Sequence, residues 1–179
     1  MNTLFSHVCV VTMDERMSVW TDAFVGVTDG KISYLSKHAP EEKPAQIIDA
    51  TGMVLMPGLI NCHTHLPMQL LRGYADDLKL QEWLNDYIFP REDRLDGRCV
   101  RAATTLAVAE CLKFGVTSVS DMYYFCDDIC DVIAKSGLKA NISRGTSMFL
   151  GDDFDFEKFP ACQELVALKN KWHNFDGGR

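Results

Sequence analysis

The sequence predicts an α/β protein in which a parallel sheet or barrel follows a group of short strands. Residues 1–56 contain short runs of β-branched and aromatic residues between turn signals, a pattern typical of small strands. Residues 57–179 alternate apolar strands with helical patterns three times, which is typical of a parallel sheet or barrel. The 179 residues are 47% hydrophobic and 24% charged, as in an ordinary folded protein, so disorder is excluded as the main state.

The first 56 residues are expected to form a meander of small strands. Residues 5–11, 23–27 and 31–35 are rich in β-branched or aromatic side chains, and Asp29-Gly30 is a hairpin signal between the last two runs. Further short strands at residues 47–49 and 53–56 flank another turn. We assign this part of the chain to one domain, and residues 57–179 to a second.

The second domain begins at Pro57-Gly58, where the pattern changes to longer apolar strands and helices. Apolar residues at helical spacing, acting together with glycine and proline stop signals, set the expected boundaries. The expected elements are a strand at 59–63, a helix at 80–88 that ends at Pro90, a helix at 96–114 closed by Gly115, a strand at 116–121, a helix at 127–136 followed by Gly137, a strand at 138–143 and a helix at 160–171.

Composition excludes several classes of function. The formal net charge is −7, whereas binding of nucleic acid or of an anionic membrane surface requires clustered basic residues. No apolar stretch approaches the ~18 residues that cross a bilayer, and the first residues lack the basic start of a targeting signal. We therefore expect a cytoplasmic protein with a small-molecule partner, without nucleic acid or membrane. The seven cysteines form no CxxC pair, so we expect them to be reduced and mostly core residues.

The sequence concentrates its chemistry at His63-Thr64-His65. Side chains two residues apart on a strand point to the same face, about 6.6 Å apart along it, so two imidazoles can converge on one transition-metal ion. Taken as an isolated pattern, two histidines at a strand end more often have no common role. This pair, however, follows the first strand of the alternating region, and ligands bind at the carboxyl ends of such strands. We therefore interpret His63 and His65 as metal ligands.

A longer stretch around the histidine pair resembles the opening of the amidohydrolase superfamily, in its branch of cytosine, guanine and adenosine deaminases and chlorohydrolases. The residues that carry this resemblance are VLMPGLINCHTH at 54–65 and LLRG at 70–73. Further segments resemble the 5′-methylthioadenosine/S-adenosylhomocysteine deaminases within that branch, namely ADDL at 75–78, EWL at 82–84, YIFP at 87–90, Glu92, and GVTSVSDMY at 115–123. The resemblance covers essentially the whole chain.

The resemblance implies a fold in which the early strands join a small β-sandwich and the rest begins an incomplete (β/α)8 TIM-type barrel. It also implies one divalent metal ion, zinc in the first place and iron as the alternative, which activates a water to attack a ring carbon bearing an amino group. The implied substrate is a purine nucleoside thioether, which is deaminated with release of ammonia. A homo-oligomer is implied for the full-length protein.

Position by position, the resemblance assigns His63 and His65 as the first two metal ligands. It assigns Trp83 to the purine, Glu92 to the ribose hydroxyls and Arg144 to the far end of the substrate, such as a homocysteine carboxylate. Each substrate residue has an alternative interpretation. Trp83 lies on an apolar helical stripe and could be a core residue. Glu92 lies in a charged run typical of a solvated loop, and Arg144 could form a surface ion pair.

Four further residues are interpreted as structural. Arg72 and Asp121 also fit the family pattern, but neither is assigned to catalysis. Cys126 and Cys130 lie one helical turn apart among aspartates, and a core-facing helix explains this spacing better than a metal pair does.

The chain is short for the implied fold, because a (β/α)8 barrel takes about 250 residues. The family's third metal histidine, a further histidine beside the metal site, its proton-shuttling glutamate and its metal-binding aspartate belong to later strands. His173 lies too early and in the wrong setting to replace the third ligand. We therefore expect the amino-terminal portion of an enzyme, inactive by itself, with no catalytic acid or base among these residues.

Two alternatives stay open on the sequence alone. A guanine or cytosine deaminase or a triazine-type chlorohydrolase would share the metal pair and would differ mainly at Trp83, Glu92 and Arg144. A non-catalytic half-barrel used for binding is a hypothesis of a different class, but it would leave apolar strand edges open, which natural soluble proteins avoid. The absence of H-x-E and P-C-x-x-C motifs excludes a cytidine-deaminase-type site.

Overall fold

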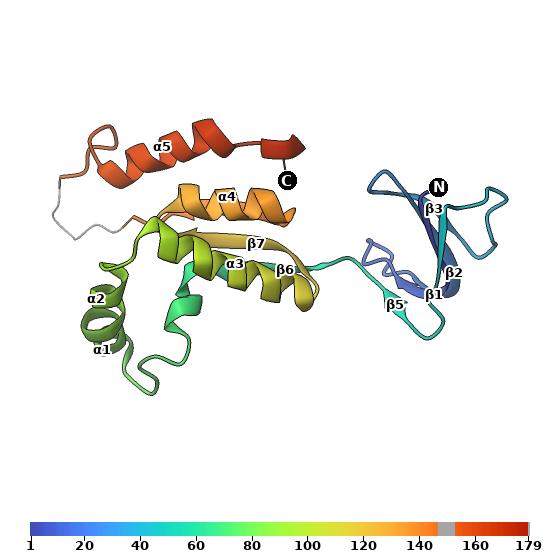
Figure 1. Cartoon of the computed structure of the whole chain (residues 1–179), viewed down its shortest axis with the longest axis horizontal. Helices are drawn as coiled ribbons and strands as arrows, with labels where there is room; N and C mark the ends of the chain where they lie inside the picture. The colour runs from blue at the N-terminus through green and yellow to red at the C-terminus, as the bar shows by residue number, and fades with distance from the viewer. Residues whose placement is uncertain (147–152, 179) are drawn as a thin grey trace. The chain divides into compact units, whose positions relative to one another are not determined.

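The computed structural model describes residues 1–146 and 153–178 (Figure 1). The chain divides into two compact units, Met1–Pro57 and Gly58–Arg179, and each is described by itself. Each unit has a buried hydrophobic cluster of its own.

The first unit is one five-stranded sheet. Its strands are β1 (Thr3–Val11), β2 (Val19–Thr28), β3 (Lys31–Ser36), β4 (Gln46–Asp49) and β5 (Val54–Leu55), in the order β3-β2-β1-β4, with β5 also paired to β1. The β2–β3 hairpin turns at Asp29 and Gly30, both at positive φ, as a tight turn of the type I′ class requires. Val8, Ala23 and Val25 lie at the centre of the buried cluster.

The predicted meander is wrong in one respect, because β4 and β5 run parallel to β1 instead of continuing an antiparallel succession. The nine-residue β1 is long enough to pair with both short strands along one edge. Its first residues, 3–6, pair with β4, and residues 9 and 10 pair with β5. The composite β-sandwich that these strands are expected to join stays a prediction.

The second unit is built on three parallel strands, β6 (Leu59–Thr64), β7 (Val116–Tyr123) and β8 (Lys139–Arg144), in the order β6-β7-β8. The register places Thr64 beside Asp121 and Tyr123 beside Arg144. The carboxyl ends of the three strands therefore meet at one edge of the sheet, where ligands bind in α/β folds.

Helical segments follow each strand. They are η1 (Leu66–Leu71), α1 (Leu80–Glu82), η2 (Trp83–Ile88), α2 (Phe89–Glu92), α3 (Gly97–Lys113), α4 (Cys126–Ser136), α5 (Pro160–Trp172) and η3 (Phe175–Gly177). The Asp96 side chain accepts a hydrogen bond from the Cys99 backbone at 2.7 Å and so caps the start of α3. The predicted stop signals are confirmed, since Gly115 and Gly137 follow α3 and α4 at positive φ.

The predicted end of a helix at Pro90 is wrong. The chain stays helical from Leu80 to Glu92, and residues 83–88 form a π-helix in which the Phe89 backbone N–H donates to the Leu84 carbonyl, five residues earlier. Pro90 then lies in the first turn of α2, directly after the π-helical segment. The helix therefore carries Glu92 at its end.

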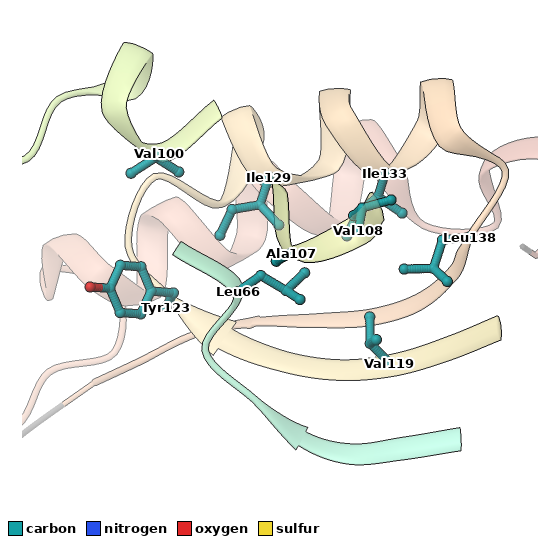
Figure 2. Packing of buried hydrophobic residues seen from close by; sticks show 9 residues of the cluster. All are labelled: Leu66, Val100, Ala107, Val108, Val119, Tyr123, Ile129, Ile133 and Leu138. Atoms are coloured by element: carbon teal, nitrogen blue, oxygen red, sulfur yellow. The ribbon is translucent and has the colours of Figure 1, made fainter. Parts of the chain in front are cut away.

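Helices α3 and α4 pack on one face of the three-stranded sheet. Figure 2 shows side chains of both helices pointing toward Val119 and Tyr123 of β7, with Leu66 between them. Ile129, at the centre of α4, is fully buried. Burial of each such aliphatic side chain contributes roughly 1.5–3 kcal/mol, so this face of the sheet is fixed by its helices.

The outer strand β6 is poorly covered on both of its faces among the described residues. Leu59 and Ile60, which point to opposite faces, are 53% and 68% exposed, although strands of a parallel sheet are usually buried on both faces. None of the helices in the described part of the chain combines the length and the apolar character that a bilayer-spanning helix needs.

Candidate functional site

His63 and His65 converge at the carboxyl end of β6. The Thr64 side chain reaches Asp121, so the alternation along β6 places His63 on the other face, and His65 directly follows the strand. Their Nε2 atoms lie 3.3 Å apart, and their rings are nearly perpendicular with centroids 5.1 Å apart. The structure therefore brings together the two residues that the sequence predicts as metal ligands.

The separation of the two Nε2 atoms fits a shared metal ion. Two nitrogens about 2.05 Å from a tetrahedral zinc ion lie about 3.3 Å from one another. The Nδ1–H of His65 donates to the backbone carbonyl of Met122 at 2.7 Å, since a carbonyl only accepts. This hydrogen bond leaves the lone pair of His65 Nε2 free, as in metal-binding histidines that are oriented by an outer partner.

The histidine pair supplies only part of a ligand set. No group of three or more His, Cys, Asp or Glu side chains within residues 1–146 and 153–178 is arranged to hold a metal ion. A catalytic zinc site uses three protein ligands and an open position, and imidazole nitrogen suits both zinc and iron. The donor set therefore fits the first half of a zinc or iron site.

Glu92, at the end of α2, is held by Tyr123 at the end of β7. The Tyr123 hydroxyl donates to Glu92 Oε1 at 2.6 Å, and its ring is buried in the core of the unit. Burial and the neighbouring Glu92 carboxylate raise the pKa of Tyr123 well above its ordinary value, so the hydroxyl stays a donor. The Tyr123 ring centroid also lies 6.3 Å from that of His65. Tyr123 therefore lies beside His65 and bonds the predicted ribose-binding carboxylate.

Glu92 and Arg144 line one pocket of about 990 Å³. Arg144 ends β8, where its Nε donates to Glu164 of α5 at 2.5 Å and its guanidinium lies 4.7 Å from the centroid of the Tyr124 ring. The volume suits a small organic ligand, and the pocket offers it a carboxylate and a cation. Lys171 adds a second cation to the pocket wall.

Trp83 does not lie in the pocket with Glu92 and Arg144. It lies half-buried on the π-helical segment and lines neither the pocket nor the histidine pair. The histidines do not line the pocket either. Of the three predicted substrate residues, the structure therefore groups Glu92 with Arg144 and leaves Trp83 apart.

The residues interpreted as structural have structural partners. Arg72 forms two hydrogen bonds with the Glu110 carboxylate, at 2.9 and 2.5 Å. Cys126 and Cys130 are buried on α4, and burial raises the pKa of their thiols to about 11 and about 12. Protonated thiols are poor metal ligands, so these cysteines act as core residues. Asp121 is buried beside the end of β6.

Sequence reasoning missed two contacts of this site. Tyr123 stands in a quoted motif, yet nothing in the local pattern indicates that it reaches a residue 31 positions earlier. Glu164 lies on a helix whose pairing with Arg144 depends on the tertiary fold. The position of Tyr123 at the carboxyl end of a barrel strand was the one available signal.

Known proteins share this sequence pattern. The model of the amidohydrolase family matches residues 54–167. A 5′-deoxyadenosine deaminase of Methanosphaera stadtmanae is 39% identical over 160 residues, which cover 88% of this chain and 36% of the relative. A 5-methylthioadenosine/S-adenosylhomocysteine deaminase of Thermoanaerobacter pseudethanolicus is 33% identical over 179 residues, which cover 100% of this chain and 41% of the relative. The chain therefore spans about two fifths of the length of these curated relatives.

A solved structure shares the fold. An adenosine deaminase from Xanthomonas campestris with bound zinc superposes with a TM-score of 0.71 at 36% identity, over 78% of this chain and 33% of that one. The sheet β6-β7-β8 with its helices is thus part of a (β/α)8 barrel, and the predicted incomplete barrel is confirmed.

Proposed function

The chain belongs to the amidohydrolase family, and on this premise we propose that the protein is a metal-dependent aminohydrolase of adenosine-type nucleosides. In this reaction an oxygen from water replaces the amino group on the purine ring, and ammonia is released. We propose a thioether nucleoside, 5′-methylthioadenosine or S-adenosylhomocysteine, as the substrate. The names of the two curated relatives support an adenosine-type substrate with a modified 5′ position.

The observation that carries the proposal is the convergence of His63 and His65. Their Nε2 atoms stand 3.3 Å apart at the carboxyl end of a barrel strand, and the Met122 carbonyl orients the ring of His65. These residues would hold one divalent metal ion, zinc in the first place, as the zinc-bound adenosine deaminase structure supports. Such an ion, when bound, lowers the pKa of a water and makes it a nucleophile.

The substrate residues are proposed from chemistry and position. Glu92 accepts hydrogen bonds from the ribose hydroxyls, with Tyr123 holding one of its oxygens. Arg144 pairs with a carboxylate at the far end of a substrate such as S-adenosylhomocysteine, which requires exchange of its bond to Glu164. Trp83 stacks on the purine, which requires that the π-helical segment face the ligand.

The remaining parts of the proposal concern the whole protein. We propose that the further metal ligands and the catalytic acid and base lie outside these 179 residues, since the chain matches about two fifths of its relatives. We propose a cytoplasmic homo-oligomer without nucleic-acid or membrane partners. Guanine, cytosine and triazine substrates are the alternatives, and the names of the relatives favour none of them.

The test is an ammonia-release assay on the full-length protein that contains this sequence. Methylthioadenosine, S-adenosylhomocysteine, 5′-deoxyadenosine, adenosine and guanine are compared, and zinc per chain is measured by elemental mass spectrometry. We expect His63→Ala and His65→Ala to lose both zinc and activity, because each removes a ligand. His38→Ala, which changes an exposed histidine of the first unit, is the matched control and is expected to keep both. Activity on guanine alone, or full zinc content without the histidine pair, would contradict the proposal.

A further inference from the structure

We propose that Asp121 is a positioning residue for the metal ligand His65, because its carboxylate fixes the residues on both sides of that histidine. Asp121 Oδ1 accepts a hydrogen bond from the Thr64 hydroxyl at 2.8 Å and one from the Leu66 backbone N–H at 2.7 Å. Thr64 and Leu66 are the immediate neighbours of His65 in the chain. The inference rests on the proposed function for the identity of His65 as a ligand.

The next residue of β7 completes the arrangement. The Met122 carbonyl accepts the hydrogen bond from His65 Nδ1 at 2.7 Å. Asp121 and Met122 of β7 therefore hold residues 64–66 at the end of β6. The Asp121 side chain bonds Thr64 and Leu66, and the Met122 backbone carbonyl bonds His65. The backbone at Asp121 and the imidazole of His65 are thus fixed relative to one another.

The burial of Asp121 indicates that this role is specific. The residue is 1% exposed, and its Oδ2 has no hydrogen-bond partner among the described residues. A buried carboxylate with an unpaired oxygen is unfavourable, and burial raises the pKa of Asp121. An apolar side chain would fill the same space without this cost, but it would leave the Leu66 N–H unpaired where β6 ends.

The bond between Asp121 and Leu66 also redirects the chain. Backbone pairing between β6 and β7 reaches Thr64 and stops, and η1 begins at Leu66. The ladder therefore offers no partner for the Leu66 N–H at this point, and the carboxylate takes that place. Without it, we expect the segment from Thr64 to Leu66 to move and His65 to lose its bond to Met122.

The experiment measures the tautomer of the His65 ring by nuclear magnetic resonance. The full-length protein is labelled with ¹⁵N-histidine, and the His65 signals are assigned by their loss in His65→Gln. In the wild type we expect one tautomer, protonated at Nδ1. Asp121→Ala is expected to give averaged shifts and about 10–100-fold weaker zinc binding, the range typical of lost outer-shell partners. Asp121→Asn keeps an acceptor oxygen, so we expect it to keep both the tautomer and the affinity.

Two controls separate positioning from general destabilisation. Ile133→Ala truncates a buried residue of the same core but leaves the end of β6 untouched, so it is expected to lower the melting temperature without changing His65. Thr64→Val removes one of the two hydrogen bonds and serves if Asp121→Ala does not fold. It is expected to shift the tautomer signals and the zinc affinity in the same direction, by less.

The outcomes distinguish this inference from the proposed function. If Asp121→Ala and Thr64→Val leave the single tautomer unchanged, or if Asp121→Asn or Ile133→Ala reproduces the loss, the positioning role is overturned while zinc binding by the wild type still stands. If the wild type holds no zinc, the proposed function fails. The tautomer of His65 in the Asp121 variants then still decides whether the carboxylate positions this ring.

Discussion

The hydrogen bond between Tyr123 and Glu92 should be measurable as a coupling between α2 and β7. Tyr123→Phe removes only the hydroxyl and keeps the ring, which packs in the buried cluster (Figure 2). The hydroxyl donates to the Glu92 carboxylate at 2.6 Å, a short distance typical of a charge-assisted bond. The substitution therefore tests this one bond.

The expected cost follows from the surroundings of the two groups. Hydrogen bonds to charged groups contribute roughly 1.5–3 kcal/mol to stability, and an acceptor left buried without its donor adds to the loss. Glu92 is only partly buried, so water can replace the hydroxyl on its side after the substitution. We therefore expect the lower end of the range, about 1.5 kcal/mol.

The assay is a double-mutant cycle in the full-length protein that contains this sequence, with Tyr123→Phe, Glu92→Ala and their combination, followed by urea denaturation. We expect a coupling energy of about 1.5 kcal/mol. Tyr124→Phe is the matched control, since it removes a neighbouring hydroxyl, and it should cost no more than about 0.5 kcal/mol. A coupling below about 0.5 kcal/mol, or an equal loss in Tyr124→Phe, would refute this account of how Glu92 is held.

The same bond predicts a pH dependence. Burial and Glu92 raise the pKa of Tyr123, so the folded state keeps its proton at pH values where the unfolded chain, near pH 10, has lost it. This part of the stability is fully present below about pH 10 and is lost as the pH rises further, and Tyr123→Phe should remove that loss.

Three further predictions concern the choice of substrate, the behaviour of the isolated 179-residue chain and the reactivity of its thiols. In the full-length protein, Arg144→Met should lower kcat/KM for S-adenosylhomocysteine and leave adenosine nearly unchanged, whereas Glu92→Gln should lower kcat/KM at least about tenfold for both nucleosides. Equal losses on adenosine and S-adenosylhomocysteine in Arg144→Met would speak against the thioether assignment. The purified 179-residue chain should release no ammonia from methylthioadenosine above a metal-free control, because its histidine pair is an incomplete ligand set. It should also bind hydrophobic dyes, because β6 exposes apolar residues. Ammonia release by this chain, or a sharp cooperative melt of its monomer, would contradict these expectations. In this chain at pH 8, iodoacetamide should modify the exposed Cys62 and spare Cys126 and Cys130, whose pKa values burial raises to about 11 and about 12, and mass spectrometry of peptides reads the difference.

Local patterns predicted the elements that depend on periodicity and stop signals. The strand before His63, the long helix closed by Gly115 and the strand that follows it are where apolar spacing and glycine place them. The proximity of His63 and His65 could also be predicted, because an i, i+2 spacing at a strand end favours two side chains on the same face.

The rest of the site depends on contacts between residues distant in the sequence. The carbonyl that orients His65 belongs to the backbone of Met122. Any residue at this position would supply the same carbonyl, so the residue type gives no indication of the contact. The charged run around Glu92 is, by its pattern alone, typical of a solvated loop, yet Glu92 has a partner on the distant strand β7. Helix propensity favoured a stop at Pro90, but the π-helical segment before it let the helix continue.

That π-helical segment sets the angle between Trp83 and Glu92 around the helix axis. Each added or removed residue rotates everything beyond it by about 100° around the helix axis. Trp83 opens the segment and Glu92 lies beyond its end, so its length determines the angle between these two side chains. Deleting a single residue between them would turn the Glu92 carboxylate away from Tyr123 while leaving Trp83 where it was. The length of this stretch is therefore what lets Glu92 reach Tyr123.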